Sequence, residues 1–127
     1  MSKTCEEQVQ SNFESRIKDI RELWMGHPDE LAEYGLSMDY VKPGTFKNQK
    51  AGYWRWQLSY GGPADEFRVY GNGEVEYWFL DWYDGAKIDV KGKDKLLVIE
   101  EMSGPLDIPL DVYRMAEEDN SEENLDN

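Results

Sequence analysis

The sequence has few of the residues on which catalytic and metal sites most often depend. Cys5 is the only cysteine and His27 the only histidine among 127 residues. A single cysteine allows no intramolecular disulfide, which is typical of proteins from a reducing compartment. A zinc site needs several cysteine or histidine ligands, and a nucleophilic serine or cysteine usually needs a histidine beside it as base. We therefore expect no catalytic residue and no cofactor, with Cys5 near a mobile chain end and His27 capping a helix.

Long apolar segments are also absent. None approaches the roughly 18 to 20 residues that a helix needs to cross a bilayer, and the first residues lack the basic and apolar regions of a signal peptide. We therefore expect a cytoplasmic protein that has no membrane partner.

Basic residues are scarce. Lys and Arg number 14 against 27 Asp and Glu, which gives a net charge of −13. Because Lys and Arg contacts with phosphate dominate binding to nucleic acid and to anionic membranes, this charge argues against direct binding to either. An acidic surface attracts basic proteins instead, including proteins whose own ligand is DNA or RNA. Solubility alone explains the excess of acids equally well.

Aromatic side chains are abundant, at 13% of the residues, with five Trp and eight Tyr. They bury large areas, and Trp and Tyr are also the usual anchors of binding surfaces. A chain of this length buries roughly two thirds of its unfolded surface, so it folds without disulfides or a structural metal. We expect a single domain over residues 1–115.

Two helices are predicted before the first strand. Thr4 and Glu7 fit a capping box, and Gly26 fits the C-cap of this first helix. Pro28 suits the first position of a short second helix, which Gly35 ends. Apolar residues three or four positions apart predict one buried face on the first helix: Val9, Phe13, Ile17, Ile20 and Trp24.

Alternation with a period of two predicts a β-meander in the middle of the chain. We expect strands over residues 36–40, 52–60, 66–70, 74–83 and 86–90. Gly71-Asn72-Gly73 is a strong hairpin signal, and Asp84-Gly85 is typical of a tight turn. One face of the second strand is expected to carry four polar or aromatic residues: Tyr53, Arg55, Gln57 and Ser59.

The last third of the chain is less regular. Asp94 fits the cap of a helix that runs toward Met102, residues 96–99 also fit a strand, and residues 106–115 are ambiguous. Residues 116–127 hold six acids, no base and one apolar residue beyond Ala116, which predicts a disordered acidic tail. The expected fold class is therefore α+β, with N-terminal helices packed on a four- or five-stranded antiparallel sheet, a further helix and this tail.

Two polar groupings invite a chemical reading. Asp81, Asp84 and Asp89 gather at one hairpin end, but turn chemistry and protection of a sheet edge explain them without a metal, so we expect no metal site. Arg55 and Arg68 lie beside aromatic residues, as in sheets on which single-stranded RNA stacks. The net charge leaves no basic groove for such binding, so we expect no nucleic-acid ligand.

The strand over residues 74–83 is apolar on both faces. A strand of this kind is either covered on both sides or leaves one face free for a partner. The N-terminal helices can cover one side, and the last third of the chain decides the other. Its two faces are Val75, Tyr77 and Phe79, and Trp78, Leu80 and Trp82.

Five segments resemble a known family: His27–Leu31, Tyr34–Leu36, Gly52–Pro63, Asp65–Arg68 and Glu76–Ala86. They are similar to a family of small acidic proteins of unassigned function that phages, plasmids and other mobile elements carry. The resemblance provides no catalytic residues. It implies a role among the small acidic proteins that block host defences, some of which present carboxylates spaced like phosphates to the DNA-binding channel of a nuclease.

We therefore hypothesise a non-enzymatic inhibitor of a nucleic-acid-targeting host defence system, of the anti-CRISPR or anti-restriction type. It would act in the host cytoplasm by stoichiometric binding of a basic Cas or restriction subunit through an acidic, DNA-mimicking surface. The alternative is an accessory or assembly protein of a mobile element, a homodimer whose acidity serves solubility. The expected contact residues are acids around the sheet and two anchoring tryptophans: Glu74, Glu76, Asp81, Asp84, Asp89, Trp78 and Trp82.

Overall fold

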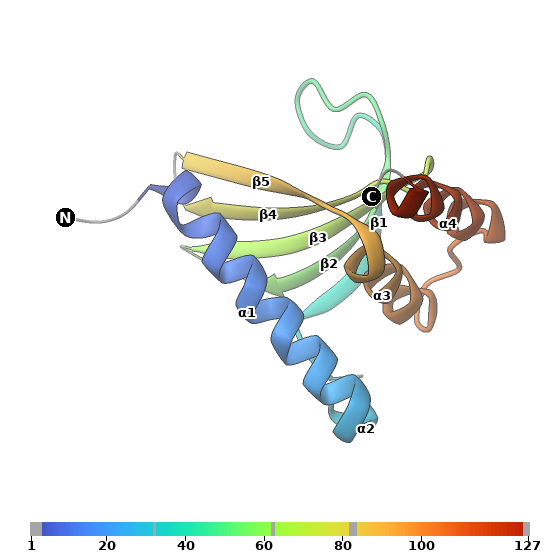
Figure 1. The fold of residues 1–127 in the computed structure, drawn as a ribbon. Coiled ribbons are helices and arrows are strands. Elements are labelled where there is room, and N and C mark those ends of the chain that lie inside the picture. The colour runs from blue at the N-terminus through green and yellow to red at the C-terminus, as the bar shows by residue number, and fades with distance from the viewer. Residues whose placement is uncertain (1–3, 32, 62, 82–83, 126–127) are drawn as a thin grey trace.

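The computed structural model describes residues 4–31, 33–61, 63–81 and 84–125, with side chains described as far as residue 118. It confirms the α+β class (Figure 1). The elements follow the order α1 (Cys5–Gly26), α2 (Pro28–Leu31), β1 (Ser37–Val41), β2 (Tyr53–Ser59), β3 (Ala64–Tyr70), β4 (Val75–Asp81), β5 (Asp84–Val90), α3 (Gly92–Ser103) and α4 (Leu110–Leu125).

The sheet is the antiparallel meander that the alternation predicts, with five strands in the order β1-β2-β3-β4-β5. Its register places Trp56 opposite Phe67 and Phe67 opposite Tyr77, so these rings share one face. The hairpin between β3 and β4 turns at Gly73, whose φ of 85° is a conformation that suits glycine. Gly73 also admits α4, because a Cβ there would lie 2.7 Å from the backbone nitrogen of Ala116.

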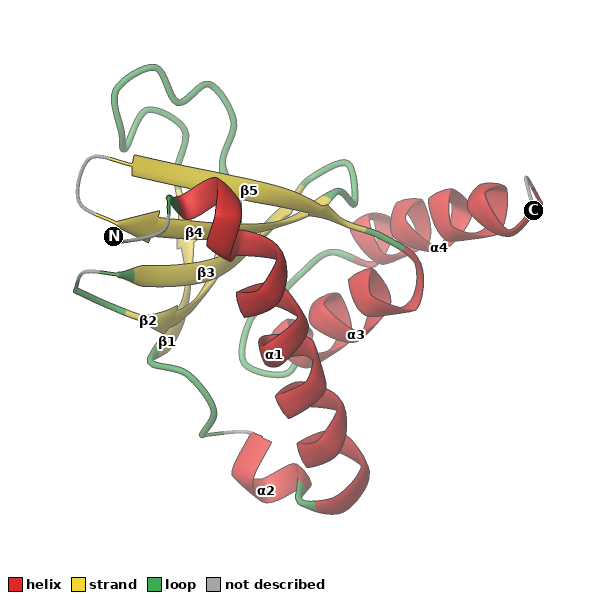
Figure 2. Ribbon diagram, turned by 60° about the vertical axis from the view of Figure 1, so that its left-hand side comes forward, coloured by secondary structure: helices red, strands yellow, loops and turns green. Residues whose placement is uncertain are grey.

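Helices α1 and α3 lie on the same side of the sheet, and in the described ranges no helix packs on the opposite side (Figures 1 and 2). Phe13 of α1 contacts the rings of Phe67 and Tyr77, with centroids 6.5 and 5.6 Å apart. The predicted packing of the N-terminal helices on the sheet is thus confirmed. The core between the helices and the sheet includes Val9, Ile17, Ile20, Trp56, Phe67, Val69, Tyr77, Phe79, Val98, Ile99 and Met102.

Helix α1 begins as predicted but ends differently. The Thr4 side chain accepts a hydrogen bond from the Glu7 backbone N–H at 3.2 Å. Gly26 is the last helical residue, and the C-cap is His27, whose N–H donates to the Leu23 carbonyl at 2.7 Å. Trp24 is 41% exposed, so the predicted buried face does not reach it. The end of α1 extends past the sheet, which leaves Trp24 little to pack against (Figure 1).

The C-terminal third is mostly helical, which corrects three expectations. Residues 96–99 lie in α3, so the strand alternative is wrong, and the N-cap of α3 is Lys91 rather than Asp94, which lies in the first turn. The acidic segment 116–127, for which we expect disorder, is helical as far as Leu125, and Ala116 is buried. The domain boundary after residue 115 stays a prediction.

Candidate functional site

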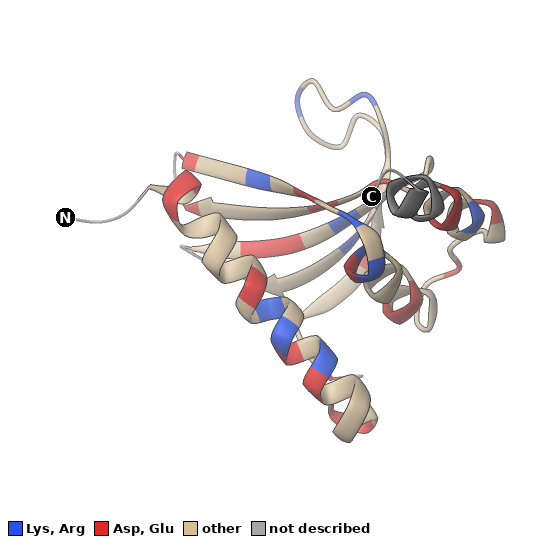
Figure 3. Cartoon of the chain, viewed as in Figure 1, with Lys and Arg blue, Asp and Glu red and all other residues tan. Residues whose placement is uncertain are grey.

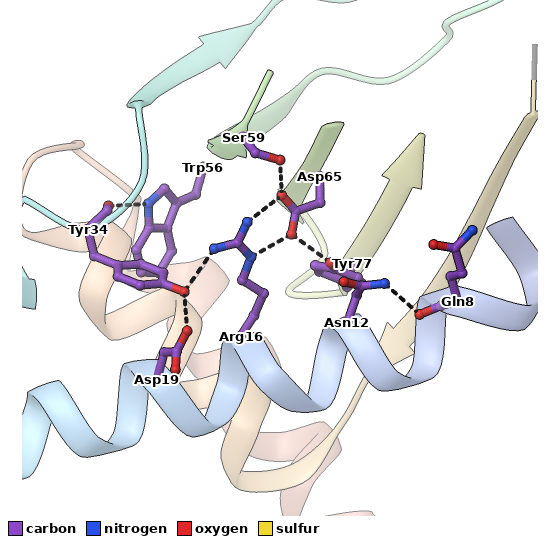
Figure 4. Close-up of polar contacts among 9 residues, drawn as sticks. All are labelled: Gln8, Asn12, Arg16, Asp19, Tyr34, Trp56, Ser59, Asp65 and Tyr77. Atoms are coloured by element: carbon purple, nitrogen blue, oxygen red, sulfur yellow. Dashed lines mark hydrogen bonds and ion pairs between the residues drawn. The ribbon is translucent and has the colours of Figure 1, made fainter. Parts of the chain in front are cut away.

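A buried polar cluster on the helix side of the sheet is centred on Asp65 (Figure 4). Asp65 is 3% exposed. It accepts hydrogen bonds from Arg16 Nε and Nη2 at 2.6 and 2.9 Å, from the Ser59 hydroxyl at 2.5 Å and from the Tyr77 hydroxyl at 2.6 Å. Burial, and then the Asp65 carboxylate, raise the pKa of Tyr77. Both oxygens of Asp65 are occupied and Tyr77 stays protonated, so this cluster holds α1 to the sheet and offers no free base.

Ser59 reaches this cluster because of an irregularity in β2. The pairing of β2 with β3 shifts its register between Gln57 and Ser59. An extra residue of this kind changes the face to which the following side chains point. Ser59 therefore lies on the helix side with Asp65, which corrects the expectation that it shares a face with Tyr53, Arg55 and Gln57.

The opposite face of the sheet carries a row of charged residues across all five strands. In the pairing register, Asp39, Arg55, Arg68, Glu76 and Asp89 lie side by side from β1 to β5. Arg55 donates from Nε and Nη2 to Asp39 at 2.9 and 2.7 Å. The face is thus built from alternate residues of each strand, as period-two alternation requires.

Glu76 lies within this row and is 8% exposed. Its carboxylate accepts hydrogen bonds from the Tyr70 hydroxyl at 2.7 Å, from Trp78 Nε1 at 2.9 Å and from Lys87 Nζ at 2.5 Å. Burial alone would raise the pKa of Glu76, but these three donors outweigh it and hold the pKa below its usual value. Burial and the neighbouring Glu76 raise the pKa of Tyr70 to about 12. Glu76 is therefore an organising acid inside the face.

Arg68 lies between two aromatic rings at the centre of the same face. Its Cζ is 4.1 Å from the ring centroid of Trp78 and 4.7 Å from that of Tyr53. Its Nε donates to Glu66 at 2.7 Å. The rings and the carboxylate hold the guanidinium in place, so Arg68 is pre-positioned.

The strands and two loops enclose a hollow of about 730 Å³ on this face. Its walls include Phe46, from the loop between β1 and β2, and Tyr60, from the turn between β2 and β3. Phe46 is 52% exposed and Tyr60 81% exposed. The lining is completed by Tyr53, Arg55, Gln57, Gly61, Ala64, Glu66, Arg68 and Leu80. We call this space the sheet-face hollow.

Of the predicted contact residues that the structure describes, Glu76, Trp78 and Asp89 share the uncovered sheet face, whereas Asp84 lies at the start of α1. Glu74 and Asp89 are exposed, Asp81 is half-buried, and Glu76 is buried and already bonded. Asp84 accepts a hydrogen bond from the Cys5 backbone N–H at 2.8 Å, which places it at the start of α1 and lowers its pKa.

Neither predicted tryptophan anchor is an exposed residue of the described surface. Trp78 is half-buried beneath Arg68, and Trp82 lies outside the described residues. Phe46 and Tyr60 are the exposed rings beside the hollow, and neither is among the predicted contact residues. Phe46 follows Pro43-Gly44 and Tyr60 precedes Gly61, but loop composition does not say over which face of a sheet a loop folds.

We expect Cys5 to lie near a mobile chain end. In the structure it lies in the core, where it is 1% exposed. Burial, followed by the nearby Asp84 carboxylate, raises the pKa of its thiol. A thiol held neutral and covered is a poor nucleophile. His27 caps α1 through its backbone N–H, which donates to the Leu23 carbonyl. Its carbonyl accepts from the N–H groups of Glu30 and Leu31 in α2.

Within the described residues, no group of three or more His, Cys, Asp or Glu side chains is arranged to hold a metal ion. No described helix has the length and apolar character needed to cross a membrane. Comparison of the chain with family models, with curated proteins and with solved structures finds no match. The function therefore has to be inferred from the chain's own residues.

Charge is unevenly distributed along the chain (Figure 3). Residues 104–127 contain eight acids and one arginine, a net charge of −7 out of −13. Residues 42–52, the loop between β1 and β2, contain three lysines and no acid. The most acidic segment and the most basic one thus belong to different parts of the fold.

Proposed function

We propose that the protein is a stoichiometric inhibitor of a nucleic-acid-targeting host defence system, of the anti-CRISPR or anti-restriction type. It binds a basic protein subunit in place of that subunit's nucleic acid. The observation that supports this proposal is the concentration of negative charge in residues 104–127. This segment contains eight acidic residues and one basic residue. A dense anionic segment attracts a basic channel and speeds association with it.

The geometry narrows the set of contact acids. Glu76 is removed from the set because it is buried and bonded to three donors. Asp84 is removed because it accepts the N–H of Cys5 at the start of α1. The exposed acids Glu74 and Asp89 and the half-buried Asp81 remain from the original set. The proposed contact surface gains acids from the C-terminal part of the chain: Asp107, Asp111, Glu117 and Glu118.

The test is affinity capture from host lysate at low and then at high salt, with mass spectrometry of the retained proteins. We expect a basic subunit of a nuclease or Cas complex to be retained at low salt and released at high salt. A variant carrying Asp107→Lys, Glu117→Lys and Glu118→Lys should lose it. The matched control, Glu6→Lys with Glu14→Lys and Glu22→Lys on the exposed side of α1, makes the same charge change and should retain it. Equal retention by both variants would contradict the proposed contact surface.

A second function is favoured by one observation, the uncovered sheet face with the exposed rings of Phe46 and Tyr60. An accessory or assembly protein that dimerises through this face would bury these rings against a second copy. Sedimentation equilibrium distinguishes the two functions. A dimer that Phe46→Asp with Tyr60→Asp converts to a monomer supports the assembly function, whereas a wild-type monomer argues against it.

A further inference from the structure

Arg55 and Arg68 are directly opposite each other in the pairing of β2 with β3, and both line the sheet-face hollow. Like charges directly opposite each other destabilise an antiparallel pair. Each arginine has its own carboxylate, Asp39 for Arg55 and Glu66 for Arg68, which offsets part of this repulsion but leaves the two arginines opposite each other. The arrangement is explained if a ligand's negative charge is held between them.

Arg55 also keeps hydrogen-bonding capacity. Asp39 accepts from Nε and Nη2 of Arg55, and among the described residues no acceptor is bonded to its Nη1. Guanidinium groups bind carboxylate, sulfonate or phosphate oxygens through such N–H pairs. Arg68 is held in place by Trp78 and Tyr53, so one of the two cationic groups is already ordered before a ligand arrives.

Apart from Gln57 and Glu66, the rest of the lining is largely apolar. Phe46, Tyr53, Tyr60, Ala64 and Leu80 contribute rings and alkyl groups on the floor and walls. The volume of about 730 Å³ lies within the range of roughly 300 to 1,000 Å³ that small-molecule sites occupy. The combination of an apolar lining with a few placed polar groups is also typical of such sites.

The sign of the local charge favours an anionic ligand. The two arginines of the lining are each paired with an acid, Asp39 or Glu66, and the adjoining loop of residues 42–52 adds three lysines without an acid, which leaves a positive excess. This positive excess is local to one face of a protein whose net charge is −13. At physiological ionic strength the acids farther away than about 8 Å are largely screened.

We propose that the sheet-face hollow is a binding site for a small amphipathic organic anion, a planar aromatic or branched apolar body with one acidic group. The acidic group lies between Arg55 and Arg68, and the apolar body lies on Tyr53 and Leu80 between the rings of Phe46 and Tyr60. The site is concave and has two loops as walls. This shape suits a small molecule better than it suits the flat surface of a protein partner. The site uses other residues than the proposed inhibitor function and stands independently of it.

The experiment uses two fluorescent probes that share one ring system and differ in charge. 8-Anilinonaphthalene-1-sulfonate carries the acidic group, and N-phenyl-1-naphthylamine lacks it. Both are titrated into the full-length protein, whose near-ultraviolet circular dichroism shows that it stays folded. We expect the anion to bind one site about tenfold more tightly than the neutral probe, despite the opposing net charge of the protein.

Variants locate the site. Arg55→Gln should abolish the preference for the anion, while Arg21→Gln, which removes another Arg–Asp pair with the same change of charge on α1, should leave it intact. Asp39, the partner of Arg55, is 44% exposed, so Arg55→Gln leaves no buried charge unpaired. Phe46→Ala and Ala64→Trp should weaken both probes, the first by removing a wall and the second by filling the hollow. Leu110→Ala is the control for Phe46→Ala, because Leu110 is also exposed but lies on α4.

Three results would overturn the proposal. Equal affinity of the wild type for the two probes would mean that the site does not recognise the anionic group. Unchanged binding in both Phe46→Ala and Ala64→Trp would place the probes elsewhere. Absence of binding by either probe, together with loss of a captured protein partner in Phe46→Ala, would assign the hollow to a macromolecule instead.

Discussion

Arg68 lies over the ring of Trp78, with its Cζ 4.1 Å from the ring centroid. The two residues occupy neighbouring strands, β3 and β4, on the face of the sheet that no described helix covers. The contact explains why Trp78 is not an exposed anchor, and it fixes one of the cations of the sheet-face hollow.

The Arg68–Trp78 contact should contribute measurably to stability. In a double-mutant cycle with Arg68→Met and Trp78→Leu, we expect a coupling free energy of about 1 kcal/mol, because a partly desolvated guanidinium over indole is attracted by the ring. Urea unfolding of the four proteins measures it. A coupling near zero would mean that the guanidinium is not held by the ring in solution.

The Asp65–Arg16 pair should matter far more than the Asp39–Arg55 pair, although both are bidentate. Asp65 is buried and Asp39 is 44% exposed. Removing one partner of a buried pair leaves an uncompensated charge and costs about 3 kcal/mol, whereas an exposed pair contributes less than about 1 kcal/mol. We therefore expect Asp65→Asn to lower the free energy of unfolding several-fold more than Asp39→Asn, by urea denaturation. Similar losses in the two variants would contradict the burial of Asp65.

The stability contributed by Glu76 should depend on pH in a defined direction. Its folded-state pKa is lowered, so the folded state favours the ionised form. The contribution is therefore complete above the unfolded pKa of about 4.3 and is lost as the pH falls through the lower folded value. Between pH 6 and pH 3 the wild type should lose more stability than Glu76→Gln, as measured by urea unfolding at each pH. Parallel losses in the two proteins would exclude Glu76 from the acid response.

Cys5 should be nearly inert toward thiol reagents while the protein is folded. It is 1% exposed and its thiol pKa is raised by burial and by Asp84. We expect its reaction with a chromogenic disulfide to be limited by opening of the N-terminal part of α1, and to become fast in denaturant. Fast reaction under native conditions would show that α1 does not hold Cys5 in the core.

Gly73→Ala tests whether α4 packs on the hairpin between β3 and β4. Gly73 and Gly44 have similar backbone angles, φ of 85° and 80°, but only Gly73 has a close neighbour, the backbone of Ala116. The left-handed conformation alone costs about 1 kcal/mol for alanine. Gly73→Ala should lower the free energy of unfolding by more than this amount, because the new Cβ displaces α4. Gly44→Ala should lower it by about this amount alone. If the two variants lose the same amount of stability in thermal unfolding, α4 does not pack on the hairpin.

The sheet could be predicted from the sequence because its determinants are local. Alternation in residues 52–58 and 74–81, with the Gly71-Asn72-Gly73 turn between β3 and β4, predicts antiparallel pairing without knowledge of the rest of the chain. Asp84 and Gly85, for which we expect a turn, are instead paired residues of β5. The capping residue Thr4 specified the start of α1 for the same reason.

The remaining features depend on contacts that distant residues make. Ser59, which follows the bulge in β2, donates a hydrogen bond to Asp65, and no composition signal marks this bulge. The charge of residues 116–125 opposes their helical state. Ala116 is buried because Gly73, which has no side chain, allows α4 to approach the hairpin closely. Phe46 joins the hollow only because its loop folds over one face of the sheet. Sequence patterns specify strands better than they specify which face a loop covers.

The proposed function rests on stoichiometric binding, so the most direct measurement is a titration of the captured nuclease or Cas complex with the protein at fixed nuclease concentration. If the protein acts by binding, residual nuclease activity should fall linearly and reach its minimum near one equivalent, with no dependence on incubation time once binding is complete. Complete inhibition by a small fraction of an equivalent, increasing with incubation time, would mean that the protein is a catalyst and would contradict the account.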